Sequence, residues 1–431
     1  MELKKELQIF AWILGFFLFA YYMPIGNATF DNALLQAFEL AKWYAQEHVI
    51  LCLIPAFFIA GVIAVFVSQG AVIKYFGANA KKWKAYTIAS LSGTILAVCS
   101  CTILPLFSSI HKRGAGLGPA ITFLYSGPAI NILAIILTAR ILGFELGIAR
   151  IVGAVVFSVV IGIIMSIIYR KEEKQRAERK DFPTTKAERP LWQTSYHFFV
   201  LVFILVFVNW GKPDTNEGIM FWLWNYKWQI TAVFGLLFMI SLLMILKMKP
   251  LYVILVAVSV GIIAFLFPAQ PLLTFVVALV GLSILTMVTP GESQDWGRET
   301  WGFAKQIMPL LAAGVLVAGL LLGTADGEGL IPGTWISSLV GGNSVQANFF
   351  ASIFGAFMYF ATLTEIPIIQ GLLNNGMGQG PALALLLAGP ALSLPNMLVI
   401  RSVIGTQKTL VYVVLVSVMA TCSGLLYGTF Y

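Results

Sequence analysis

Apolar runs of about 20 residues, separated by short polar connections, make up most of the chain. A helix needs about 20 apolar residues to cross the roughly 30 Å hydrocarbon core of a bilayer, so each run predicts a membrane span. Two further stretches, 85–110 and 347–369, are apolar but interrupted by proline and polar residues, and they predict re-entrant or broken-helix hairpins. The predicted fold is an all-α polytopic membrane protein. Continuous spans are expected near residues 7–25, 48–69, 117–141, 144–169, 194–210, 225–246, 250–268, 271–289, 304–323, 380–402 and 408–428.

The sequence repeats itself, without a gap, after 262 residues. Under this shift Pro105 falls on Pro367. The element Ser-Gly-Pro-Ala-Ile-Asn, which ends at Asn131, falls on Ala-Gly-Pro-Ala-Leu-Ser, which ends at Ser393. Because chance agreement at so many glycines and prolines is not expected, the chain is predicted to contain two related halves.

The distribution of charge predicts how these halves are oriented. Lysines at 74–84 place the loop after the second span in the cytoplasm, and the basic residues at 111–113 require the same side. Both conditions hold only if 85–110 enters and leaves on one face. Counting the membrane crossings onward from there gives the second half the opposite orientation in the membrane. Two inverted-topology repeats are therefore expected, as in many secondary transporters. The predicted division is a first span at 1–29, repeat 1 at 30–170, a basic cytoplasmic loop at 171–193, a four-span insert at 194–289 and repeat 2 at 290–431.

Composition and charge exclude several other classes of protein. Hydrophobic residues make up 59% of the chain and charged residues 11%, whereas soluble domains carry about 25% charged residues. The net charge of +8 lies in short loops at span ends, where it orients the protein in a membrane, so no nucleic-acid partner is expected. The four cysteines lie in apolar stretches, which argues against a secreted disulfide framework. Catalytic triads, phosphate loops and paired carboxylates are absent, so neither enzyme activity nor a cofactor is expected.

The first interrupted stretch carries the most reactive side chains. Cys99, Ser100, Cys101 and Thr102 precede Pro105, and a proline removes a backbone donor and disfavours helical geometry at the residue before it. Two thiols at this spacing do not share a helix face, but a turning backbone brings both to one centre. Thiolates select Cu(I), Zn(II) and thiophilic metalloids, so the two cysteines are candidate metal ligands and all four residues candidate substrate contacts. The alternative is that the cysteines only pack as small hydrophobic residues.

Glu365 is the ionisable residue of the second interrupted stretch, and Ile103 occupies the matching position in the first. An ionisable group is expensive at membrane depth and is by default a functional hypothesis. Glu365 is therefore the candidate carrier of a coupling proton. The alternative is a structural glutamate that bonds to a neighbouring helix end.

The repeated Gly-Pro-Ala elements predict two helix breaks in mid-membrane. Asn131 and Ser393 then offer polar side chains beside unwound backbone, and both are candidate substrate contacts. A plain kink without substrate contact is the alternative. The residues predicted to break helices are Pro105, Gly127, Pro128, Pro367, Gly389 and Pro390.

The motifs Cys-Ser-Cys at 99–101, Lys-Arg-Gly-Ala-Gly-Leu-Gly-Pro at 112–119 and Ser-Gly-Pro-Ala-Ile-Asn at 126–131 carry a resemblance to a known group. Over 85–150 the chain resembles the YraQ/ArsP permease family. This resemblance implies a multi-pass protein of the bacterial inner membrane that exports trivalent organoarsenicals or copper and zinc. It also implies that the two cysteines of the first motif receive the substrate.

These observations lead to a proton-coupled secondary exporter of a thiophilic metal or metalloid species. Its expected partners are a small inorganic or organometalloid substrate and membrane lipid, and a homo-oligomer is left open. A monomethyl arsenic(III) species needs two thiolates and Cu(I) accepts two, whereas Zn(II) usually takes four ligands. Two alternatives stay open: a membrane thiol-disulfide oxidoreductase, and a channel or a subunit of a larger permease complex with another substrate.

Overall fold

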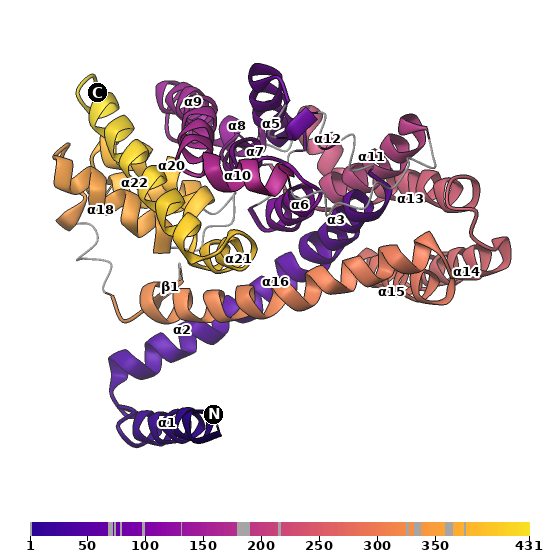
Figure 1. Ribbon diagram of the computed structural model, residues 1–431, viewed down its shortest axis with the longest axis horizontal. Helices are drawn as coiled ribbons and strands as arrows, with labels where there is room; N and C mark the ends of the chain where they lie inside the picture. The colour runs from indigo at the N-terminus through magenta and orange to yellow at the C-terminus, as the bar shows by residue number, and fades with distance from the viewer. Residues whose placement is uncertain are drawn as a thin grey trace.

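The computed structural model describes residues 2–67, 72, 75–77, 80–96, 100–130, 132–178, 190–213, 217–324, 327–331, 338–357, 365–374 and 376–431. This part of the chain is almost entirely helical (Figure 1). The elements before the insert are α1 (Glu2–Tyr21), α2 (Ala28–Tyr44), the π-helix η1 (Ala45–Leu53), α3 (Ile54–Phe66), α5 (Lys82–Leu96), α6 (Ser100–Lys112), α7 (Leu117–Ala129), α8 (Ile132–Ile141), α9 (Phe144–Ile168) and α10 (Arg170–Glu178). They are followed by α11 (Leu191–Val208), α12 (Ile219–Asn225), α13 (Lys227–Met244), α14 (Pro250–Leu266), α15 (Pro271–Val288), α16 (Glu292–Leu322), the short strands β1 (Gly323–Thr324) and β2 (Gly327–Glu328), α18 (Val345–Phe357), α19 (Glu365–Asn374), α20 (Gln379–Leu392), α21 (Leu394–Ile404) and α22 (Thr406–Gly428).

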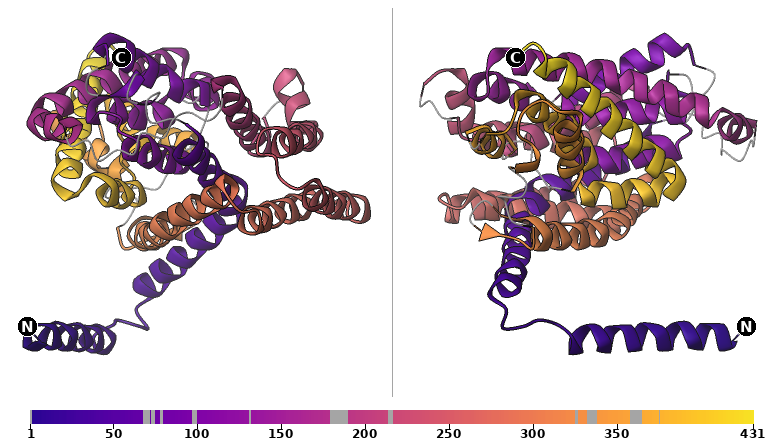
Figure 2. Two further views of the ribbon diagram at one scale, coloured as in Figure 1. Left: turned by 45° about the vertical axis from the view of Figure 1, so that its right-hand side comes forward. Right: turned by 90° about the vertical axis from the view of Figure 1, so that its left-hand side faces the viewer.

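Six helices of the described part are long and apolar enough to cross a membrane. The number becomes seven if α20 and α21, which are bent by 47° at their junction, form one span. With these spans and almost no strand, the predicted class of all-α polytopic membrane protein is confirmed. The helix α1 lies apart from the rest of the molecule (Figure 2).

Two long helical segments form a crossed frame beneath the bundle (Figure 1). One is the run α2–η1–α3, and the other is α16, which packs along both α2 and α3. Trp296 of α16 donates to the carbonyl of Phe58 at 2.8 Å, and a Cβ at Gly61 would lie 2.7 Å from the Trp296 ring. The helical run begins at Ala28 rather than near residue 48, and the polar side chain of Gln36 within it is buried against Thr324.

The upper bundle consists of two helix sets with the same order. We call α5 to α9 the first set and α18 to α22 the second set. Adding 262 to the bounds of α7 gives 379–391, and α20 occupies Gln379–Leu392; the other four pairs of helices agree to within three residues. The turns also correspond, because Gly114 and Gly376 both have left-handed backbone, with φ of 97° and 96°. A Cβ would be strained at this φ, so the repeated glycines are explained by the repeated turn.

Close helix crossings hold each set together in the same way. α7 packs between α5 and α9, and α20 packs between α18 and α22. A Cβ at Gly118 of α7 would lie 2.8 Å from the carbonyl oxygen of Gly162 on α9, and one at Gly380 of α20 would lie 2.5 Å from that of Gly424 on α22. Small residues at these crossings allow the backbones to approach, as is usual between membrane helices.

Part of each stretch predicted to be interrupted lies outside the described residues, namely 97–99 and 358–364. The structure describes α5 up to Leu96 and α6 from Ser100, and α6 continues through Pro105; the proposed break at this proline is therefore wrong. Pro105 lies in the second turn of α6, and buried neighbours such as Leu104 and Leu106 hold the helix together despite the lost donor. Pro367 is the third residue of α19, in the first turn, where a missing backbone N–H costs least.

Candidate functional site

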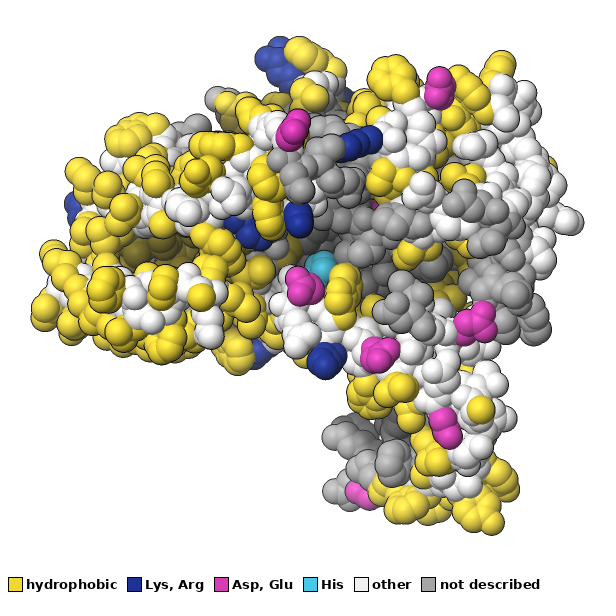
Figure 3. Space-filling model, turned by 180° about the vertical axis from the view of Figure 1, so that it is seen from behind, with side chains coloured by type: hydrophobic (Ala, Val, Ile, Leu, Met, Phe, Trp, Pro, Cys, Tyr) yellow, Lys and Arg dark blue, Asp and Glu magenta, His cyan; other side chains and the backbone are white. Residues whose placement is uncertain are grey.

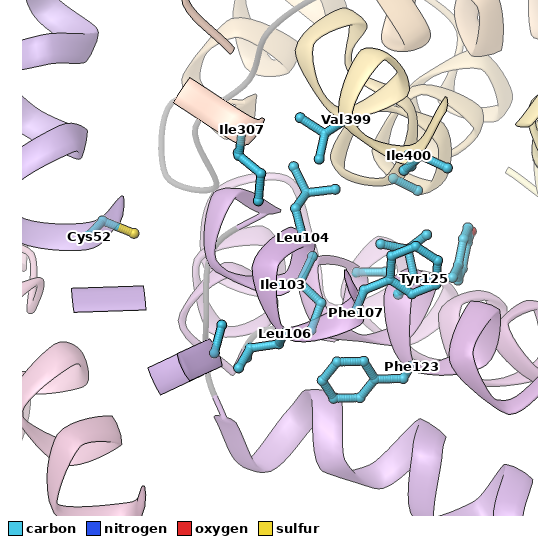
Figure 4. Close-up of a cluster of buried hydrophobic side chains, with 14 of the residues drawn as sticks. Cys52, Ile103, Leu104, Leu106, Phe107, Phe123, Tyr125, Ile307, Val399 and Ile400 are labelled. Atoms are coloured by element: carbon cyan, nitrogen blue, oxygen red, sulfur yellow. The ribbon is translucent and has the colours of Figure 1, made fainter. Parts of the chain in front are cut away.

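The helix breaks after the two Gly-Pro-Ala elements are present at matching positions. Pro128 lies in the last turn of α7, which ends at Ala129, and Pro390 lies in the last turn of α20, which ends at Leu392. The helix that follows each break contacts the other set: α8 packs on α19 of the second set, and α21 packs on α6 of the first. Figure 4 shows this meeting point, with Leu104 of α6 beside Val399 of α21.

A buried ion pair joins the two sets. The guanidinium of Arg150, on α9, bonds through Nη2 to Oε1 of Glu365 at the start of α19, and the two side chains are 0% and 1% exposed. Nη1 of Arg150 also donates to Oγ1 of Thr138 on α8 at 2.8 Å. Among the described residues, Nε of Arg150 and Oε2 of Glu365 have no hydrogen-bond partner. The guanidinium therefore connects α8, α9 and α19 while retaining unused bonding capacity.

Two tyrosines extend this polar cluster toward the other helices. Tyr125 of α7 donates to the backbone carbonyl of Leu387 on α20 at 3.0 Å. Tyr412 of α22 is fully buried, and its hydroxyl has no partner among the described residues. The shift of 262 residues places Tyr125 on Leu387 and Arg150 on Tyr412. The cluster therefore lies where corresponding positions of the two sets face each other.

The break between α20 and α21 also holds buried polar atoms. Ser393 is 2% exposed and its Oγ has no hydrogen-bond partner among the described residues. Asn396 is equally buried; its Nδ2 makes a long 3.5 Å contact with the carbonyl of Pro390, and its Oδ1 is without a partner in the same part of the chain. A broken helix with unused polar atoms is the kind of backbone that transporters use for small solutes.

Several of the predicted site residues fall outside the described part of the chain. They are Cys99 and Asn131, together with the side chains of Ser100, Cys101 and Pro367. Ser100 and Cys101 form the first two residues of α6. Of the predicted contacts in and beside the Cys-Ser-Cys motif, Thr102 is described and fully buried.

A third cysteine lies next to this motif. Sγ of Cys52 is 3.1 Å from Oγ1 of Thr102, and both residues are buried. Cys52 belongs to η1, and π-helical turns within longer helices are frequent at functional sites. Figure 4 shows its sulfur directed toward the buried side chains of α6. Within the described side chains, no group of three His, Cys, Asp or Glu forms a ligand set for a metal ion.

Arg150, the two tyrosines and the position of Cys52 were not predicted from the sequence. Arg150 had a usable signal, because it lies inside the predicted span 144–169, where the rule that selected Glu365 applies equally. Tyr125 directly precedes Ser126 of a repeated element, but a tyrosine in an apolar run does not reveal its partner. Cys52 had no local signal, since it is far in sequence from Thr102.

Comparison with known proteins shows the family to which the chain belongs. The family model ArsP_1, described as a predicted permease, matches residues 34–429. The chain belongs to this permease family. The resemblance to YraQ/ArsP permeases is thereby confirmed, and it extends well beyond residues 85–150.

Two relatives are similar to this permease over different shares of its length. The UPF0718 protein MJ0584 of Methanocaldococcus jannaschii is 43% identical over 387 residues, which cover 89% of this chain and 93% of that protein. The UPF0718 protein YraQ of Escherichia coli is 32% identical over 115 residues, or 26% of this chain and 30% of that protein. No solved structure matches the chain. The family and the helices together support a multi-pass membrane permease.

Proposed function

We propose that this permease is a proton-coupled secondary exporter of a thiophilic metal or metalloid species, either a trivalent organoarsenical or copper and zinc, in a bacterial inner membrane. In this proposal Cys99 and Cys101 receive the substrate and Glu365 carries the coupling proton. The observation that carries it is the buried ion pair between Arg150 and Glu365, which connects the two helix sets at their broken helices. A charged pair in this position is expensive to bury, and such pairs in membrane proteins mark ion and proton pathways.

The coupling step follows from the chemistry of the pair. While Glu365 is ionised, its attraction to Arg150 ties α19 to α9. A proton on Glu365 removes the attraction between the two charges and leaves at most a hydrogen bond to a neutral carboxyl, while Arg150 keeps its bond to Thr138 on α8. Proton binding thus loosens the tie between the two sets, and proton release restores it. Alternation between these two arrangements exposes the site to opposite sides of the membrane in turn.

The matching helix bounds support the view that the two sets are inverted repeats. The crosswise contacts of α6 with α21 and of α19 with α8 exchange with each other when the sets are exchanged, as a two-fold relation requires. Through the positive-inside rule, the basic residues at 74–84 and 111–113 favour opposite orientations of the two sets in the membrane. Inverted repeats place the substrate near the midplane, between broken helices.

Cys52 supports a soft substrate. Its contact with Thr102 brings a third thiol to the residue that follows Cys101 in the chain. Thiolates bind Cu(I), Zn(II) and trivalent arsenic in preference to hard cations. The proposed site therefore has more soft ligands available than the pair in the motif.

Uptake into everted membrane vesicles tests the proposal. Methylarsenite, Cu(I) and Zn(II) are offered to vesicles that contain the parent, the Cys99→Ser/Cys101→Ser variant or Glu365→Gln. Cys422→Ser is the matched control, because Cys422 is exposed on α22. We expect one species to accumulate in the parent and the control, and not in the double cysteine variant. Glu365→Gln and collapse of the proton gradient are expected to abolish accumulation as well.

The opposite results separate the alternatives. If all three species cross at the same rate with and without the cysteine pair, at equal protein levels in the membrane, the soft-substrate proposal is wrong. Flux of one species that needs neither the gradient nor Glu365 identifies a channel. Exchange of thiols and disulfides without flux identifies an oxidoreductase.

A further inference from the structure

The four longer helices of the insert are arranged as two separate hairpins. α11 packs on α13, and α14 packs on α15, whereas α13 and α14 make few contacts with each other. The first hairpin is attached to the frame through α3 and the second through α16. Figures 1 and 2 show the α14–α15 hairpin extending beside α16, away from α11 and α13.

A cavity of about 650 Å³ lies between the two hairpins. Its walls come from α3, α11, α13, α14 and α15, and the lining is almost entirely apolar, with Leu201, Phe238 and Leu282 as examples. Gly235 and Gly261 also line it, and no atom lies within 4 Å of a Cβ built at either position. The space therefore reaches the helix backbones. Figure 3 shows the molecule hollowed between two hydrophobic arms on this side.

The cavity follows the length of the hairpin helices. It extends from Trp228 and Pro271, at the beginnings of α13 and α15, to Leu242 and Leu285 near their ends. Fourteen residues of helix measure roughly 21 Å, so the apolar lining offers a hydrocarbon chain continuous contact over about that length.

A cationic turn lies at one end of this cavity. The connection between α13 and α14 carries Lys247 and Lys249, both exposed, next to the lining residues Leu242 and Val253. We take α11, an apolar helix of 18 residues, as a span beside α13 after the basic loop 171–193, whereas α12, with seven residues, is too short to cross. The lysines therefore lie on the same side as that loop, which is the cytoplasmic side. Anionic lipids are enriched in the cytoplasmic leaflet and are attracted by lysines near the surface.

We infer that the insert binds one anionic phospholipid, with an acyl chain in the cavity between the hairpins and the phosphate at Lys247 and Lys249. The acyl chain makes van der Waals contacts with the apolar lining, and it joins the α14–α15 hairpin to the rest of the permease. This inference stands apart from the proposed transport reaction, because none of its residues belongs to the site around Glu365.

The test is a lipid count on the full-length protein. The parent is reconstituted into vesicles of equal parts phosphatidylglycerol and phosphatidylcholine, extracted in mild detergent and weighed by native mass spectrometry. Gly235→Leu/Gly261→Leu fills the cavity, and Lys247→Gln/Lys249→Gln removes the cations. Gly302→Leu is the matched control, since Gly302 is a helical glycine of α16 that also has open space around its Cβ position.

We expect one retained phosphatidylglycerol in the parent and in the control, and at least a tenfold loss of it in the filled variant. The lysine variant should keep a bound lipid but lose its preference for phosphatidylglycerol over phosphatidylcholine. Circular dichroism and gel filtration confirm that each variant is folded. Equal lipid retention in the filled variant and the control would overturn the inference.

Discussion

The ion pair between Arg150 and Glu365 can be tested with a double-mutant cycle. Both side chains are at most 1% exposed, so replacing one of them leaves the other charge buried and uncompensated. Breaking a buried pair in this way costs about 3–5 kcal/mol, whereas replacing both partners by apolar residues of similar volume is about neutral or stabilising. We therefore expect Arg150→Met and Glu365→Leu each to lower the free energy of unfolding by about 3–5 kcal/mol. The double variant should lie close to the parent, which gives a coupling energy of about 6 kcal/mol or more between the two sites.

The assay is unfolding in detergent micelles, followed by circular dichroism as denaturant is added. The chain offers an exposed pair as a control, because Arg298 and Asp295 lie 3.7 Å apart on α16 with 71% and 60% of their side chains exposed. The same cycle at this pair should give a coupling energy of at most about 1 kcal/mol. If the two single losses at Arg150 and Glu365 simply add in the double variant, the pair is not the buried tie described above. The double variant should also be folded and still fail to accumulate substrate against a gradient, which separates the role of the pair in coupling from its role in stability.

Three further predictions concern positions around the same bundle. Gly162→Ala should destabilise the fold by about 1–3 kcal/mol in the same assay, because its Cβ would lie 2.1 Å from Oγ1 of Thr122; an unchanged free energy would contradict the close crossing of α7 and α9. Tyr125→Phe removes the bond to the carbonyl of Leu387 and should cost about 1–2 kcal/mol, and no loss would show that the bond is not made. Cys52→Ala should lower the rate of thiol-dependent uptake in everted vesicles several-fold, whereas Cys52 acting only as a buried hydrophobic residue predicts an unchanged rate.

The positions of the helix breaks could be predicted because they depend on local chemistry. A proline removes one backbone hydrogen bond wherever it stands, so Gly-Pro-Ala elements at 127–129 and 389–391 weaken their helices in any fold. Pro105 shows the limit of this reasoning. It also removes a donor, yet α6 continues through it, because burial of the neighbouring side chains in the bundle outweighs the loss.

The candidate site likewise contains residues that could be predicted from the sequence and residues that could not. Glu365 could be found because an ionisable residue in an apolar stretch is unusual on its own. Its partner could not, since nothing near Arg150 in the sequence refers to a residue on α19. The contact of Cys52 with Thr102 likewise depends on how η1 packs against α6.

The sequence by itself determined the membrane class, the approximate position of many apolar helices and the repeat of 262 residues. These features follow from apolar run length and from glycine and proline positions, which act on the chain locally. The tertiary structure decided which residues meet: Arg150 with Glu365, Tyr125 with Leu387, and the two insert hairpins with a cavity between them. Such pairings depend on which faces of distant helices are brought together, and an apolar helix that is hydrophobic on all sides carries no pattern from which that face can be read.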